Sequence, residues 1–505
     1  MTFRQTLLST AAMALIGAPH AAFADVSAQD VWSDWKSYMQ AFGYNVEGSE
    51  ATSGDTLTIS EMKMMVDLPD EEGSVSIDLT GVTFTNMSDG SVEIKIPETM
   101  PISFKFNTEK DEPIEGVLDY TNSDLSIKVS GDPANMTYQT NAAELALAVR
   151  TVTVAGTTIP LNAVNMKLGN VTSKMEMKIG NLREVVQSFA AASLSYDIDI
   201  PPIDGNTFKL VGSMNALNFD GTGAYPMGGF DPQDMSAMLK AGFAFTGMFT
   251  HQGGNIDFDG LIDGEAMQGK STTQSGSLKV AMDADQLHYT AAATGLTSNM
   301  TGGGIPLPVE INAENSSFNF KMPVGTSDEA KDFEFGILLG GFTTSEMLWS
   351  MVDPTAQLPR DPATLNIDLA GKAKLLIDIF NPEEAAKMEA GTAPGEVESL
   401  EVRALQLKAA GADLTGKGAF TFDNSDMETI PGMPKPTGAV ELKLTGGNGL
   451  LDKLVAMGLV QDEQAMGARM MMGLFAVAGE GEDTLNSKIE VNEEGHVLAN
   501  GQRLR

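Results

Sequence analysis

The sequence predicts a mainly β protein of elongated, curved antiparallel sheets, with a few amphipathic packing helices in N-terminal, central and C-terminal positions. Three observations support this prediction: apolar and polar residues alternate over most of the chain, turn-forming clusters separate the alternating runs, and few stretches have helical spacing. No residue period repeats, which argues against a propeller or a regular solenoid.

Alternation with a period of two dominates from about Asp55 to Gly325 and predicts strands with one apolar and one wet face. The scheme returns late in the chain, where apolar residues from Leu400 to Leu407 lead through Gly411 to Phe422. The clearest alternating runs are 75–79, 92–96, 125–129 and 175–179. The predicted turns between strands include 88–90, 130–133 and 220–221.

The first predicted helix follows Ser27, a residue type that caps helices, with Asp30 three residues further on. Aromatic and apolar residues then recur at helical spacing as far as Phe42, and Gly43 ends the helix. A central helix contains Trp349 and ends at Asp353, because the residue before a proline is pushed out of the helical region.

Two more helices are predicted near the C-terminus. The first is marked by Leu450, Leu451, Leu454 and Val455, and the second by Met466, Met470, Leu474 and Val477, with Gly479 closing it. We expect these helices to close one end of the curved sheet and to open it to a hydrophobic ligand, with Met466, Met470 and Leu474 in contact with that ligand. The alternative is a stripe that packs permanently on the sheet.

Residues 1–24 have the pattern of a secretory signal peptide. Arg4 provides the charged start, residues 7–16 the short apolar run, and 22–24 the small-residue cleavage site, so Asp25 begins the mature chain. The apolar run is too short to span a bilayer. We therefore expect a periplasmic protein with no transmembrane segment once the leader is removed.

One proline pair and one Gly-Thr-Ser segment suggest where the mature chain divides. The candidate boundaries are Pro201–Pro202 and the segment 325–327. The predicted organisation is a signal peptide (1–24), an N-terminal β-rich region with a leading helix (25–202), a central β meander (203–325) and a C-terminal β region with helices (326–505).

Composition excludes several classes of function. The chain has 68 acidic against 32 basic residues and a net charge of -36, which repels nucleic acid. It has no cysteine, so thiol nucleophiles, iron–sulfur clusters and thiolate zinc sites are excluded. Only four histidines are present, and they lie far apart in the sequence, so we expect neither a histidine-rich metal site nor a histidine-dependent catalytic triad. We expect no cofactor.

Residues 264–271 match the phosphate-binding loop pattern letter for letter, with Lys270 in the place of the phosphate lysine. That loop must open a helix whose N–H groups surround the phosphate, whereas here an alternating strand follows at 278–282. We therefore predict no nucleotide site.

Methionine is abundant, with 31 residues and clusters at 62–65, 175–177 and 470–472. Thioethers bind Cu(I), but same-face spacing also follows from strand burial, so we interpret the clusters as core filling. Pairs of acidic residues occur at Asp197 and Asp199, at Asp283 and Asp285, and at Asp423 and Asp426. They lack the glycine and terminal glutamate of a calcium loop. Neither a nucleophile elbow nor a zinc-protease helix occurs in the sequence. We expect no enzyme activity.

Two segments resemble an exported bacterial family known only as domain-of-unknown-function family 2125. One is 31–44, with the sequence VWSDWKSYMQAFGY; the other is 347–354, which continues through 358–365 into Asp368–Leu369. The resemblance runs from Trp32 to the Asn500–Gly501 turn and rests on helix and turn residues. It implies an exported protein and brings no catalytic residue or cofactor with it.

We expect a non-catalytic role in the cell envelope, in which a curved sheet presents an apolar concave face to a lipid or another hydrophobic partner. The alternative is a periplasmic hydrolase whose site is assembled from distant strands. The sequence favours the non-catalytic role over the hydrolase only because it shows no recognisable catalytic motif.

Overall fold

The computed structural model describes residues 25–68, 73–107, 113–203, 205–229, 234–303, 305–389 and 393–505. The predicted signal peptide, residues 1–24, lies outside the described residues. Of the described residues 65% are in strands and 12% in helices, and all strand pairs belong to one antiparallel sheet. The predicted fold class is therefore confirmed.

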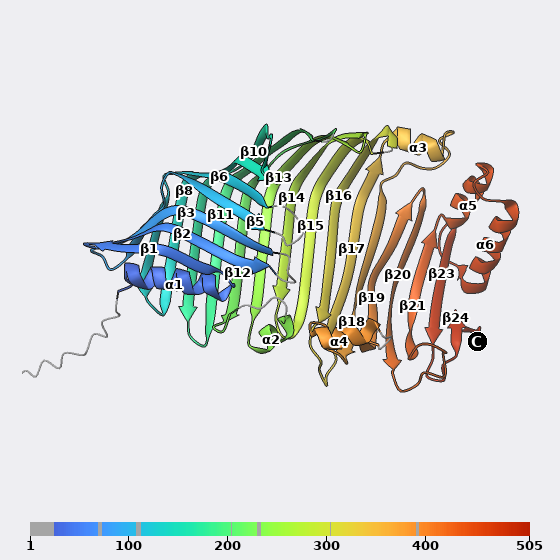
Figure 1. Ribbon diagram of the computed structural model, residues 1–505. Helices are drawn as coiled ribbons and strands as arrows, with labels where there is room; N and C mark the ends of the chain where they lie inside the picture. Colours follow the sequence, from blue (N-terminus) through green and yellow to red (C-terminus); the bar gives the residue numbers. More distant parts are fainter. Residues whose placement is uncertain are drawn as a thin grey trace, which may run out of the picture.

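The strands follow one another along the whole described chain (Figure 1). They are β1 (Asn45–Ser53), β2 (Thr56–Leu68), β3 (Gly73–Asn86), β4 (Val92–Lys95), β5 (Thr99–Asn107), β6 (Ile114–Ser123), β7 (Ser126–Asp132), β8 (Asn135–Val154), β9 (Thr157–Ile159), β10 (Ala163–Ile179), β11 (Leu182–Ile203), β12 (Asn206–Pro226), β13 (Ala244–Ile262), β14 (Glu265–Met282), β15 (Gln286–Gly302), β16 (Ile305–Pro323), β17 (Lys331–Thr344), β18 (Ala363–Leu375), β19 (Gly395–Ala409), β20 (Ala412–Asp423), β21 (Lys435–Thr445), β22 (Val477–Ala478), β23 (Thr484–Val491), β24 (Val497–Ala499) and β25 (Gln502–Arg503).

The helices of the described chain lie at the ends and edges of this sheet (Figure 1). They are α1 (Ala28–Ala41), α2 (Met235–Lys240), α3 (Glu346–Val352), α4 (Pro382–Glu389), α5 (Gly447–Ala456) and α6 (Asp462–Phe475). Among them, none is both long and apolar enough to cross a membrane.

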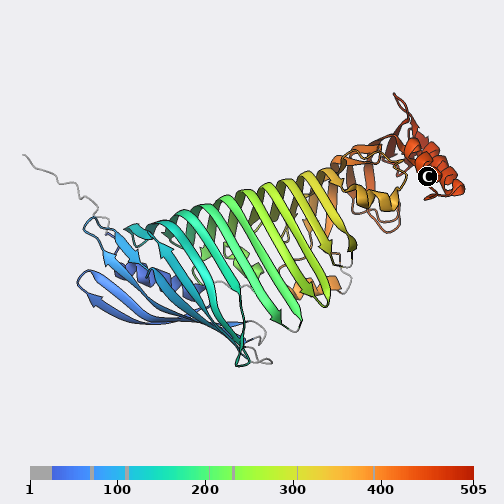
Figure 2. The ribbon, with the colours of Figure 1, turned by 90° about the horizontal axis from the view of Figure 1, so that it is seen from above.

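From β10 to β21 the sheet is an uninterrupted meander, in which each strand pairs antiparallel with the next one in the chain. The result is an elongated molecule with the start of α1 at one end and the C-terminus at the other (Figures 1 and 2). Short connections between long alternating strands favour this order, because neighbouring strands can pair as soon as they form.

The N-terminal end is more complex, because the sheet divides there. β3 reaches β8 by two routes, one through β4 and β7 and the other through β5 and β6. β1, β2 and β3 lie in front of the following strands, and α1 lies beside them (Figure 1). This doubling provides the second layer that α1 packs against.

A line of residues in the left-handed conformation crosses the meander at mid-strand: Asn170, Ala216, Gly253, Gly295 and Gly341, with φ between 47° and 63°. Such a residue interrupts the alternation of side chains, so Leu168 and Val171 lie on the same face and pack in one cluster. Because side chains from both sides of the line pack together, this face is the inside of a bend, and the two views show an arched sheet (Figures 1 and 2).

The helix predictions hold at the N-terminus and fail in one detail at the C-terminus. Ser27 and Asp30 form the predicted capping box, and Gly43 follows α1 with φ of 84°. The last helix ends at Phe475, before the predicted stop at Gly479, because Val477 leaves the helix and pairs with Asn486 in the sheet.

One predicted turn is wrong. Asp220 and Gly221 lie inside β12, where they pair with Met248 and Gly247 of β13. A glycine in a strand marks close approach by another group as readily as it marks a turn. Here the group is the ring of Phe219, which covers Gly221.

The sheet continues across both predicted boundaries. Pro201 and Pro202 lie near the end of β11, which pairs with β12 along its length, and Gly325 follows β16, which pairs with β17. The division into regions 25–202, 203–325 and 326–505 therefore stays a prediction about folding units.

Candidate functional site

One side of the meander is apolar over most of its length, and we call it the apolar face. Side chains of directly paired residues point to the same side of a sheet, so the strand register defines its rows. One row consists of Phe189, Phe219, Phe249, Leu278, Ala291, Phe318, Ile337, Ile367 and Leu405. A neighbouring row contains Val280, Tyr289, Phe320, Phe335, Leu369 and Val402. None of these residues is charged.

Beyond the bend the same face continues with further apolar side chains. Leu168 pairs with Leu194 and Leu194 with Met214, and all three pack in one cluster with Val171 and Phe249. Further rows on this side are Ile198, Leu210 and Phe258, and then Met300 and Val309. The apolar face therefore covers both halves of the arch.

The opposite side, which we call the charged face, carries ion pairs. Arg403 lies 3.8 Å from Glu334 and 3.9 Å from Asp368, on two neighbouring strands. Lys270 lies 3.1 Å from Asp257, its partner in the register. Exposed pairs of this kind contribute little to stability, but they keep one side of the sheet in water.

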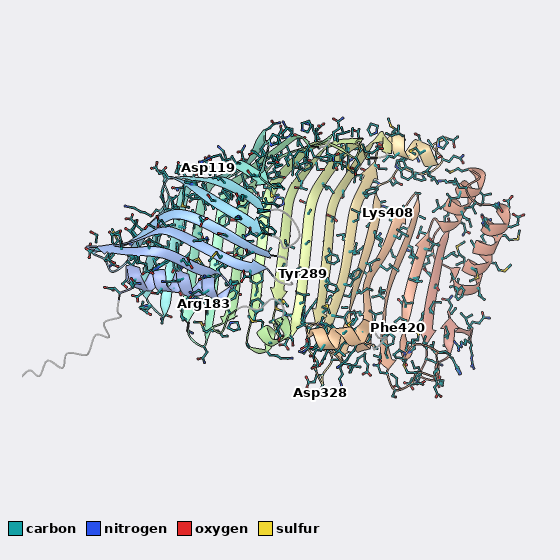
Figure 3. The ribbon with its side chains drawn as sticks, viewed as in Figure 1. Asp119, Arg183, Tyr289, Asp328, Lys408 and Phe420 are labelled. Carbon is teal, nitrogen blue, oxygen red and sulfur yellow. The ribbon has the colours of Figure 1, made fainter. Side chains whose placement is uncertain are left out.

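The middle of the apolar face is not covered by another layer. Leu278 is 46% exposed and Phe318 40%. Tyr289 and Met300 are exposed as well, and Tyr289 lies near the centre of the sheet (Figure 3). Single exposed apolar residues are ordinary, whereas a large contiguous exposed apolar surface is uncommon on a monomeric protein.

Aromatic rings lie flat over glycines at several places on the apolar face. A Cβ atom built on Gly221 would lie 2.7 Å from the Phe219 ring, and one on Gly269 would lie 2.6 Å from the ring of Phe258. Gly212 lies in the same way under Tyr196. Because the rings lie along the sheet, the surface stays low and leaves room above it.

The lower edge of the apolar face is bordered by α2 and α4 (Figure 1). Met238 and Leu239 of α2 pack with Met282 and Leu287 of the face. The loop before α4 is held to α2 by Asp378, which accepts hydrogen bonds of 2.5 Å from Ser236 and 2.9 Å from Lys240. Burial opposes ionisation of Asp378, but these hydrogen bonds hold its pKa below its usual value.

At the N-terminal end, α1 covers the apolar face. Its Val31 and Trp32 are buried in a core with Phe84 of β3 and Met177 of β10. Asp34 of α1 forms an ion pair of 2.7 Å with Arg183 of β11, and both side chains are 6% exposed. α1 is therefore held at this end by a packed core and by a buried pair of opposite charges.

At the C-terminal end, α5 and α6 cover the last strands of the face. Between these helices and Leu407, Leu414 and Leu444 of the sheet lies an apolar cavity of about 360 Å³. Its helix side is formed by Leu450, Leu451, Leu454, Ala468 and Met472. The predicted position of these helices at one end of the sheet is confirmed (Figures 1 and 2).

The predicted ligand residues Met466, Met470 and Leu474 lie on the outer side of α6 and are exposed. They do not line the cavity, which is lined on α6 by Ala468 and Met472. The side of α6 that faces the cavity carries the small Ala468 beside Met472, so it is less apolar in sequence than the outer side. The role of these three residues in binding a hydrophobic ligand stays a prediction.

The methionine clusters at 62–65 and 175–177 differ from the cluster at 470–472. Met62 and Met177 are buried in the N-terminal core, and Met175 packs against it, as the core-filling interpretation predicts. Met470 and Met471 are exposed, so the prediction fails for the C-terminal cluster. Among the residues that the structure describes, no group of three or more histidine or acidic side chains could hold a metal ion.

The segment that resembles a phosphate-binding loop forms a hairpin. Gly264 is the turn residue with φ of 81°, and β14 begins at Glu265, so the predicted strand in place of a helix is confirmed. The ammonium of Lys270 is paired with Asp257 on the charged face.

Arg360 lies in the turn before β18 and forms an ion pair with Asp353. Its guanidinium lies 2.7 Å from the buried carboxylate of Asp353 and stacks on Trp349 at 4.5 Å. Burial opposes ionisation of Asp353, but N–H donors of Leu358 and Gln357 together with Arg360 hold its pKa below its usual value. These contacts join α3 to the turn before β18, so Arg360 stabilises the local structure.

The sequence did not identify the exposed residues at the centre of the apolar face, such as Leu278 and Phe318. A weak signal was present: Phe219 and Phe245 each precede a glycine by two residues, the arrangement in which a ring covers its neighbour. Alternation alone predicts an apolar side but does not say whether another layer covers it.

The fold and its two unlike faces define an elongated, single-sheet β protein with an uncovered apolar side. The profile of the family DUF2125, described as an uncharacterized protein conserved in bacteria, matches residues 236–500. The match spans more than half of the chain, so the protein belongs to this family. It includes the segment 347–369 that showed the resemblance, whereas 31–44 lies outside it. No curated protein and no solved structure matches the chain.

Proposed function

We propose that the protein is a non-catalytic binding protein that holds a lipid or another hydrophobic ligand against its apolar face. The observation that carries this proposal is the exposed middle of that face, where Leu278, Tyr289 and Phe318 lie in adjoining rows without a covering layer. Leaving such a surface in water costs about 25 cal/mol per Å² of apolar area, and an alkyl chain laid on it removes this cost.

The separation of the two faces supports this role. The charged face, with pairs such as Lys270 and Asp257, keeps the protein in solution while the apolar face is loaded. The same separation supports a non-catalytic role, because the charged side chains of these ion pairs lie on the side of the sheet that faces away from the proposed ligand.

Export to the periplasm is part of the proposal. Processing before Asp25 would leave a chain that enters the fold at once, since Val26 is buried and its N–H donates to the carbonyl of Gly131 at 3.1 Å. Mass analysis of the protein from a bacterial periplasmic extract tests this directly. A chain that still begins at Met1 contradicts it.

The binding role is tested by placing two carboxylates on the apolar face. We expect the Leu278→Glu/Phe318→Glu variant to lose co-purified lipid by about tenfold or more, because an unpaired charge beside an alkyl chain is costly. The measurement is native mass spectrometry after purification under mild conditions, with extraction and quantification of the bound lipid.

The matched control carries the same two charges on the opposite side of the sheet. Met248 and Val186 pair with Lys279 and Thr222 on the charged face, and they are 46% and 52% exposed, close to the values for Leu278 and Phe318. The Met248→Glu/Val186→Glu variant should keep its lipid. Equal loss in both variants, or a wild-type protein that carries no hydrophobic ligand, contradicts the proposal.

A further inference from the structure

A cavity of about 390 Å³ lies between α1 and the first strands of the apolar face. α1 contributes Asp34, Trp35, Tyr38 and Met39; the sheet contributes Ile127, Tyr138, Thr140, Ser173, Met175, Met177, Arg183, Val185, Gln187 and Tyr225. Arg183 marks its place beside α1 in Figure 3. The volume is in the range of small-ligand sites.

We infer that this cavity binds the uncharged polar head of a single-chain amphiphile, whose alkyl chain lies along the apolar face. The inference rests on the proposed function and adds to it the class of ligand and the direction in which the ligand lies. Three features support it: the charges of the cavity, its hydrogen-bonding groups, and its connection to the apolar face.

The charges in the cavity are already balanced. Arg183 is paired with Asp34, its guanidinium lies 5.1 Å from the Tyr38 ring, and one of its N–H groups points to the sulfur of Met177 at 2.8 Å. An anionic head would meet Asp34, and a cationic head would meet Arg183, each without a free partner. Because unbalancing a buried pair is costly, a neutral head fits best.

Hydroxyl and amide groups remain to bind such a head. Among the described residues the side-chain amide of Gln187 has no hydrogen-bonding partner, although it lies in the cavity wall. Tyr38 and Tyr225 line the same cavity, and burial raises the pKa of both, so their hydroxyl groups stay protonated. A head with hydroxyl groups, such as glycerol, supplies matching donors and acceptors.

The cavity opens onto the aromatic row of the apolar face. Ser173 at its edge pairs with Phe189, and the row continues through Phe219 and Phe249 to Leu278. Strands are about 4.8 Å apart, so the three intervals from β11 to β14 span about 14 Å. This is close to half of a bilayer core, the reach of one alkyl chain. An amphiphile with its head at Gln187 would therefore end near Leu278.

Trp35 in the cavity wall provides a direct test of head position. The probe is 1-oleoylglycerol brominated either near its carbonyl group or near the end of its chain, and the measurement is quenching of tryptophan fluorescence. We expect strong quenching from the head-end bromine and weak quenching from the chain-end bromine. The Trp35→Phe variant should lose the strong quenching by the head-end bromine. This loss separates the fluorescence of Trp35 from that of Trp32 and Trp349.

The Gln187→Leu variant tests the head contact itself. We expect its affinity for 1-oleoylglycerol to fall about fivefold, the effect of one hydrogen bond, and oleate to bind more weakly than 1-oleoylglycerol in the wild type. The matched control is Gln268→Leu, an exposed glutamine of β14 on the charged face, which should bind like the wild type.

The outcomes separate this inference from the proposed function. Equal affinity for oleate and 1-oleoylglycerol, quenching that is stronger from the chain end, or no effect of Gln187→Leu overturns the inference while the binding role stands. A wild-type protein that binds neither probe overturns both.

Discussion

The two ends of the sheet each carry amphipathic helices, but the helices are packed very differently. α1 buries Val31 and Trp32 in a core with Phe84, and it pairs Asp34 with Arg183. α5 has no buried residue and α6 has one, Ala465. One end of the apolar face is thus covered by a firmly packed helix, and the other by a loosely packed pair of helices.

The difference shows that an apolar stripe predicts contact with a sheet but not how tight the contact is. The Trp32 ring of α1 packs against Phe84, whereas α6 turns Ala468 and Met472 toward the cavity and leaves Met466 and Met470 outside. For a ligand that lies along the apolar face, the loosely packed end is the easier one to open, since fewer buried contacts must break.

The largest expected difference between the ends is in the cost of losing one core side chain. Trp32→Ala should lower the free energy of unfolding by about 3–5 kcal/mol, because it leaves a cavity and removes the hydrogen bond from the indole to Glu50. Leu450→Ala in α5 should cost about 1 kcal/mol. Urea denaturation measures both, and equal costs would refute the contrast.

A smaller effect is expected from the N-terminal cap of α1. Ser27→Ala should lower the free energy of unfolding by about 1 kcal/mol, because the Ser27 hydroxyl accepts from the N–H of Asp30. Ser33→Ala, on the exposed side of the same helix, serves as the control and should change the stability by less than about 0.5 kcal/mol. If both variants unfold at the same urea concentration, the cap does not contribute.

Acid should loosen the C-terminal end by a local effect. α5 is capped by Asp483, a distant carboxylate that accepts from the N–H groups of Asn448 and Gly449. Burial opposes ionisation, but these bonds hold the pKa of Asp483 below its usual 3.8. A carboxyl group with a lowered pKa in the folded state stabilises above pH 3.8 and loses that contribution as the pH falls through the folded value.

Hydrogen exchange measured between pH 5 and pH 3 tests this cap, after correction for the intrinsic pH dependence of exchange. The α5 amides should lose protection as Asp483 becomes protonated, whereas the first turn of α1, capped by Ser27, should keep its protection better. In the Asp483→Asn variant the protection of α5 should no longer depend on this titration. An unchanged pH profile in the variant would rule out Asp483 as the cause.

The smallest effect is expected on the outer side of α6. Met470→Gln should change the free energy of unfolding by less than about 0.5 kcal/mol, because the side chain is 71% exposed. Met472→Gln, the same substitution on the cavity side of the helix, should cost about 1 kcal/mol. A larger cost at Met470 would mean that its side chain is packed in solution.

Local signals predicted α1 and the hairpins well, because the capping box at Ser27 and the turn at Gly411 depend on neighbouring residues alone. They failed at Gly221 and Gly479, where the role of a glycine depends on a partner strand. The pair of Asp34 with Arg183 joins residues far apart in the chain, so no local pattern indicated it. The ion pair forms only when α1 packs against β11 in the folded protein.

The alternation of side chains by itself determined that this chain forms antiparallel strands with one apolar and one charged side, because neighbouring residues of a strand point in opposite directions. The spacing of Trp32 and Trp35 likewise determined that α1 must cover apolar surface. Only the tertiary structure decided which part of the apolar side stays uncovered. That part is the area left between α1 at one end and α5 and α6 at the other, and its position follows from strand order, from the bend and from side-chain volumes across the sheet.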